Sequence, residues 1–115
     1  MPSNPSSESQ IAIPPAFIAL FVPPGRVKPT ASWAHIAERH EFCEDLATML
    51  TDTARARLFE LHISEEEVLE RTLAGLRENT ALVSADEALW VTRRLAELLE
   101  WPLTGELAPD AGPRN

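Results

Sequence analysis

The sequence predicts an all-α fold, a small helical domain built around one long helix. Three observations favour this class. Apolar or small residues recur in steps of three and four over about residues 32–62, without Gly or Pro to interrupt them. Two Ser-x-x-Glu patterns precede apolar runs further along the chain. Only one segment is rich enough in apolar residues to form a strand, and a strand needs a partner.

The first element lies in residues 11–22, IAIPPAFIALFV, and two interpretations are open. In a short helix, Pro14 and Pro15 would occupy the first turn, where a missing backbone donor is harmless. The alternative is an extended arm. The helix is favoured because no second β-rich segment could pair with it. In both cases its apolar side chains need a cover.

The long helix covers about residues 32–62, and either Ser32 or Thr30 fits its N-cap. Thirty helical residues would measure about 45 Å. One face of this helix carries the apolar stripe Trp33, Ile36, His40, Cys43, Ala47, Leu50, Ala54, Leu58 and Leu61.

Two shorter helices follow, each opened by a capping signature. Ser64 with Glu67 predicts a helix over about 65–78, and Ser84 with Glu87 predicts one over about 85–100. The first ends near Asn79 and the second before Pro102. The helix over 65–78 should bury the residues Val68, Leu69, Thr72, Leu73 and Leu76.

Composition divides the chain into three parts. Residues 1–10 and 102–115 are rich in Pro, Gly or polar residues, so each is predicted to be a disordered tail. Residues 11–101 should form a single helical domain, and the polar first ten residues do not resemble a secretory leader.

Charge and cysteine content narrow the function classes. The net charge of −8, without a basic patch, argues against nucleic acid as a partner. The longest apolar run has 12 residues and contains two prolines, whereas a membrane span needs about 20, so no membrane partner is expected. The single cysteine, Cys43, excludes an internal disulfide and fits the reducing cytoplasm.

No catalytic pattern stands out. The phosphate-binding pattern G-x-x-x-x-G-K-[ST] does not occur, which excludes ATP hydrolysis of the common P-loop type, and no cofactor is expected. His40 and Cys43 lie three residues apart on the long helix and could place two metal ligands side by side. A zinc site needs four ligands, which one chain does not easily supply. The alternative is that Cys43 packs in the core and His40 at its edge.

Aromatic residues at the ends of elements are candidate contacts for a protein partner. Trp33 opens the long helix and Trp101 follows the last one, and tryptophan is enriched at interfaces. Phe17 and Phe21 project from the arm over residues 11–22. These four residues are the predicted interaction residues, and packing in the protein's own core is the competing interpretation.

Three strings, IPPAFIALFVPPGR, ERHEFCEDLATML and WVTRRLAELLEW, resemble a group of small bacterial proteins that often bear the label "ATPase with chaperone activity". The resemblance covers about residues 11–101 and transfers no catalytic residue. It implies association with an ATPase or chaperone encoded elsewhere. The sequence thus predicts a non-enzymatic, cytoplasmic protein-interaction module that self-associates, and a metal-dependent regulator or enzyme using His40 and Cys43 is the alternative.

Overall fold

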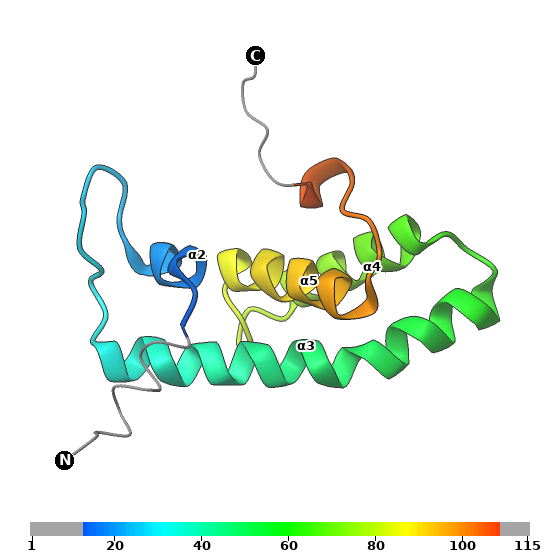
Figure 1. The fold of residues 1–115 in the computed structure, drawn as a ribbon, viewed down its shortest axis with the longest axis horizontal. Helices are drawn as coiled ribbons and strands as arrows, with labels where there is room; N and C mark the ends of the chain where they lie inside the picture. The colour runs from blue at the N-terminus through cyan, green and yellow to red at the C-terminus, as the bar shows by residue number, and fades with distance from the viewer. Residues whose placement is uncertain (1–12, 109–115) are drawn as a thin grey trace. The chain divides into compact units, whose positions relative to one another are not determined.

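The computed structural model describes residues 13–108, and within that range the fold is all-α, as predicted. No strand occurs between residues 13 and 108. The elements of the described residues follow in the order α2 (Pro15–Ile18), η1 (Ala19–Phe21), α3 (Trp33–Leu61), α4 (Glu65–Glu78), α5 (Ala85–Leu99) and η2 (Gly105–Leu107), where η marks a 3-10 helix (Figure 1). None of these helices combines the length and the apolar character needed to cross a membrane.

Contacts within the chain group it into two compact units, Met1–Cys43 and Glu44–Asn115, with the boundary inside α3. The sequence predicted one domain over residues 11–101. The N-terminal unit contains α2, η1 and the first turns of α3. The C-terminal unit contains the rest of α3 together with α4, α5 and η2.

In the N-terminal unit, the arm is a short helix rather than an extended segment. Pro14 is the N-cap of α2, and its carbonyl oxygen accepts from the backbone N–H of Phe17 at 3.0 Å. The α-helical turn tightens into η1, which ends at Phe21. Gly25 follows Pro23 and Pro24 at a φ of 79°, and the turn is closed by the N–H of Arg26 donating to the Pro23 carbonyl.

Helix α3 begins one residue after Ser32, the predicted N-cap. The Ser32 Oγ accepts from the backbone N–H of His35 at 3.1 Å. Thr30, the alternative cap, instead donates its N–H to the carbonyl of Phe21. The 29 residues of α3 correspond to about 43 Å. In the middle of its predicted stripe, Ile36, Cys43, Ala47 and Ala54 are buried and His40 and Leu50 are half-buried, whereas Trp33 and Leu61 at its two ends are exposed.

Helices α4 and α5 begin at the predicted serines, with one difference between their caps. At α5, Ser84 and Glu87 each accept from the other's backbone N–H, at 3.0 and 2.9 Å, which completes a capping box. At α4, Ser64 accepts from the N–H of Glu67, but the Glu67 carboxylate accepts from Arg71 Nε at 2.9 Å. The predicted box at α4 is therefore only half formed, because Arg71 lies one turn away and offers a charge-assisted bond.

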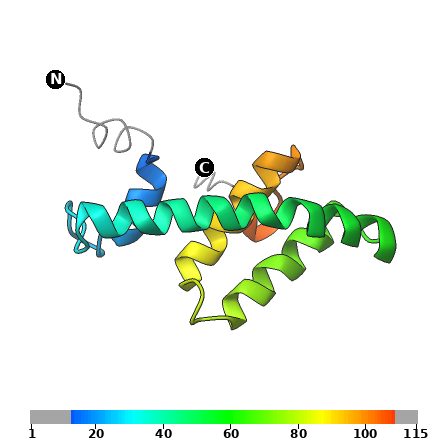
Figure 2. The same cartoon turned by 90° about the horizontal axis from the view of Figure 1, so that it is seen from below.

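The core of the C-terminal unit lies where α4 and α5 pack together. The five residues predicted to be buried in α4 are all buried. Figures 1 and 2 show a loop leading from the end of α3 into α4 and a second connection leading from α4 into α5. The hydroxyl groups of Thr72 and Thr92 are buried, and each donates to a carbonyl one turn earlier in its helix, which avoids an unsatisfied polar group in the core.

Ordered structure continues beyond Trp101, which corrects the predicted boundary of the C-terminal tail. Residues 102–108 are described, and they include η2 with Leu107 buried. The segment is held by side chains from α4 and α5, which its own Pro- and Gly-rich composition does not reveal. The predicted tail over residues 1–10, and the part of the other tail after residue 108, lie outside the described residues.

Candidate functional site

The four predicted interaction residues divide between the two units, with Phe17, Phe21 and Trp33 in the N-terminal unit and Trp101 in the C-terminal unit. Phe17 and Phe21 lie together in the N-terminal unit, with ring centroids 5.5 Å apart. Phe17 is 0% exposed, and its ring lies against those of Phe21 and His40, so within this chain it packs in the core. Trp33, at the start of α3, is 37% exposed, and Phe21 is half-buried. Trp101 belongs to the C-terminal unit and is half-buried.

His40 and Cys43, the predicted metal ligands, both lie in well-packed surroundings. The ring of His40 meets the ring of Phe17 edge-on at 5.2 Å, and Cys43 is completely buried. Among residues 13–108, no three His, Cys, Asp or Glu side chains gather closely enough to hold one metal ion. The geometry therefore favours packing roles for both residues.

One apolar surface was not among the predicted sites. In the C-terminal part of α3, Met49 is 67% exposed and Phe59 is 80% exposed, and Ala56 between them is also exposed. These residues are spaced by seven and then three positions, which places them along one side of the helix. Ala47 and Ala54, which are buried, lie on the opposite side. We call Met49, Ala56 and Phe59 the outer strip of α3. Asp52, whose side chain is 97% exposed, lies on the same side of the helix between Met49 and Ala56. The same spacing is readable in the sequence.

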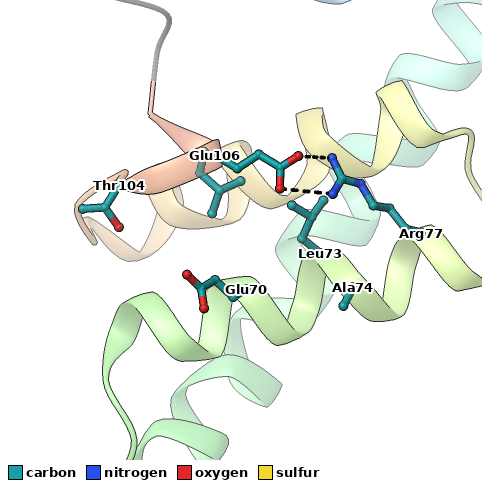
Figure 3. A pocket seen from close by; sticks show the side chains of 7 residues that line it. Glu70, Leu73, Ala74, Arg77, Thr104 and Glu106 are labelled. Atoms are coloured by element: carbon teal, nitrogen blue, oxygen red, sulfur yellow. Dashed lines mark hydrogen bonds and ion pairs between the residues drawn. The ribbon is translucent and has the colours of Figure 1, made fainter.

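A pocket lies between α4 and the C-terminal segment. Its volume is about 220 Å³. Glu70, Leu73, Ala74 and Arg77 line it from α4, where their spacing of three and four residues places them on one face. Thr104, Glu106 and Leu107 line it from the segment that contains η2. Figure 3 shows Arg77 and Glu106 meeting at one end, while Glu70 and Thr104 lie at the other.

The ion pair at this pocket is bidentate. Arg77 Nη1 donates to Glu106 Oε1 at 3.1 Å, and Nη2 donates to the other carboxylate oxygen. Hydrogen bonding to this guanidinium lowers the pKa of Glu106, and the same bonds raise the pKa of Arg77. Both side chains remain open to solvent, so the pair fixes position more than it contributes to stability.

Arg93 from α5 holds the backbone of the same segment. Its Nε donates to the carbonyl of Leu107 at 2.9 Å, and its Nη2 donates to the carbonyl of Ala108 at 3.2 Å. The side chain of Leu107 is buried at 3% exposure. Residues 104–108 are thus bound through a carboxylate, two carbonyl groups and one apolar side chain.

Arg94, the neighbour of Arg93, connects α5 to α3 within the C-terminal unit. Its Nε donates to Glu44 at 2.9 Å and its Nη1 to Glu97 at 3.0 Å. Hydrogen bonds to these two carboxylates raise the pKa of Arg94. Arg94 is thus paired with carboxylates, whereas Arg93 donates to main-chain carbonyl groups.

Comparisons of this chain with protein-family models, with curated proteins and with solved structures find no match. The resemblance to the chaperone-labelled bacterial proteins stays a prediction.

Proposed function

We propose that the protein is a non-enzymatic interaction module that self-associates through the outer strip of α3. The observation that carries this proposal is the exposure of Met49 and Phe59, at 67% and 80%, on one side of a long helix. A helix surface of this kind pairs well with a second helix, since side chains at these spacings interdigitate. The same strip on a second copy would meet it around a two-fold axis.

The size of the strip sets the expected strength of the interaction. Burying a Met or Phe side chain completely contributes roughly 1.5–3 kcal/mol, and a symmetric dimer would bury four. The gross gain of roughly 6–12 kcal/mol must exceed a cost of association of about 4–15 kcal/mol, and with the cost at the lower end of this range a net gain of about 5 kcal/mol remains. We therefore expect a weak dimer, with a Kd on the order of 100 μM.

Sedimentation velocity over a range of protein concentrations tests the proposal. The wild-type chain should change from monomer to dimer as its concentration passes about 100 μM. The double variant Met49→Ser, Phe59→Ser should stay monomeric. Val27→Ser is the matched control, because Val27 is 90% exposed but lies in the loop after η1. A wild-type chain that stays monomeric up to about 1 mM would contradict the proposal.

A role in the cytoplasm as an accessory to a chaperone or ATPase is the finer part of the proposal. It is supported by the resemblance of the three sequence strings and by the single cysteine, which is buried. Affinity capture with the wild-type chain, followed by ATPase assays of the captured proteins, tests this role. Recovery of an ATPase by the wild-type chain would support this role, and its loss with the Met49→Ser, Phe59→Ser variant would assign the contact to the outer strip of α3. Recovery of no ATPase or chaperone would contradict the role.

A further inference from the structure

The C-terminal segment occupies a groove on α4 and α5 in the way that a bound peptide would. Glu106 meets Arg77, and the Leu107 side chain is buried. Arg93 donates to the two carbonyl groups at the end of the segment. Recognition of an acidic side chain, an adjacent apolar side chain and main-chain carbonyls is a common basis for peptide binding.

The segment fills this groove only in part. Among residues 102–108, only Leu107 is buried. The Glu106 side chain is 58% exposed, so its bond to Arg77 exchanges readily with water or with another carboxylate. The pocket of about 220 Å³ beside Leu73 and Ala74 remains open. A ligand that also filled this pocket would bind better than the segment does.

The open end of the pocket indicates what such a ligand carries. Glu70 and Thr104 lie at this end. Leu73 and Ala74 form an apolar wall between this end of the pocket and the end where Arg77 meets Glu106. A Lys or Arg side chain at the position of Thr104 would lay its methylene groups on this wall and place its charge near Glu70. An acidic side chain at the same position would be repelled.

We propose that this groove binds a short peptide of a partner protein with the pattern basic-x-Glu-Leu, and that residues 104–108 are its intramolecular competitor. The charges fit, since Arg77 and Arg93 face the acidic residue and the carbonyl groups, while Glu70 faces the basic residue. The chain's own segment, Thr104-Gly105-Glu106-Leu107, has the Glu and the Leu of this pattern but carries Thr104 in place of the basic residue.

Fluorescence polarisation with the full-length chain tests this proposal. The probe is a labelled peptide with the sequence of residues 101–108, WPLTGELA. It should bind the variant Glu106→Gln, Leu107→Ser about tenfold more tightly than it binds wild type, because the attached competitor acts at a millimolar effective concentration. The peptide carrying Thr104→Lys should bind more tightly still, and the one carrying Thr104→Glu more weakly.

Three controls make the result decisive. A peptide with Glu106→Gln and Leu107→Ser should not bind, and adding Arg77→Gln to the Glu106→Gln, Leu107→Ser variant of the protein should weaken its binding of WPLTGELA by about threefold, as expected for loss of an exposed ion pair. If the Glu106→Gln, Leu107→Ser variant loses helical circular dichroism, the single substitution Glu106→Gln, at an exposed side chain, replaces it. This single variant should bind the peptide about threefold more tightly than wild type does. The proposal would be overturned if WPLTGELA bound wild type and the Glu106→Gln, Leu107→Ser variant with equal affinity, or if neither chain bound it at a concentration of about 1 mM. The Met49→Ser, Phe59→Ser variant should bind the peptides as wild type does, so the two proposals fail separately.

Discussion

Replacing Glu100 by glycine should stabilise the protein. Glu100 follows α5 with φ 61° and ψ 37°, in the left-handed region. Its N–H donates to the carbonyl of Glu97 at 3.1 Å, and the N–H of Trp101 donates to that of Ala96 at 2.9 Å. These two bonds form a Schellman end, a position where glycine is preferred. A residue with a Cβ costs roughly 1–2 kcal/mol in this conformation.

The net gain is smaller than this strain, because glycine also has more freedom in the unfolded chain. That freedom costs about 0.4–1 kcal/mol. Removing a negative charge from the C-terminal end of α5 raises the free energy of unfolding by roughly 0.3 kcal/mol. The expected total for Glu100→Gly is therefore about 1 kcal/mol, or about 4 °C in Tm.

Urea unfolding followed by circular dichroism measures this gain as a higher midpoint at an unchanged slope. Glu100→Gln is the matched control, because it removes the charge but keeps the Cβ, so it should gain only the electrostatic part. Equal stability of the Gly and Gln variants would refute the argument from backbone strain.

Three further predictions concern a cap, an ion pair and the thiol. Ser84→Ala should lower the free energy of unfolding by about 1 kcal/mol in urea unfolding, and Ser84→Gly by only a few tenths. Pairing with Arg77 lowers the pKa of Glu106, so the pair stabilises the C-terminal segment at pH 7 and is lost as the pH falls through the carboxyl range. The NMR signals of the Leu107 methyl groups should report this loss in wild type, and the Glu106→Gln variant should show no such transition. Cys43 is 0% exposed, so a thiol reagent should label it about 100-fold more slowly in the native chain than in urea, and fast native labelling would revive a catalytic role.

The helices could be predicted from sequence because their signals are local. The apolar spacing and Ser32 located α3 within one residue at each end, and Ser64 and Ser84 located the starts of α4 and α5. In each case the cap is a hydrogen bond between residues three positions apart, so both partners lie within one short stretch of sequence.

The C-terminal segment could not be predicted because its partners are far away in the chain. Glu106 binds Arg77, 29 residues earlier, and Leu107 is held by Arg93, 14 residues earlier. Pro, Gly and polar residues are typical of a disordered tail, and no periodicity within residues 102–108 indicates a docking site. The sequence indicated that the side chains of the arm need a cover, but the residue that meets Phe17, His40, lies on a different element, and no local pattern identifies it.

Salt should separate the two proposed surfaces. The chain carries a net charge of −8, so two copies repel each other, and added salt should strengthen a dimer formed through the apolar outer strip. The α4–α5 groove binds its ligand through Arg77, Arg93 and Glu70, and salt screens these attractions, so peptide affinity should fall as salt rises. Opposite salt dependences of dimerisation and peptide binding would therefore assign each activity to its own surface. If dimerisation also weakened with salt, charged contacts would drive it, and the outer strip of α3 would not be the interface.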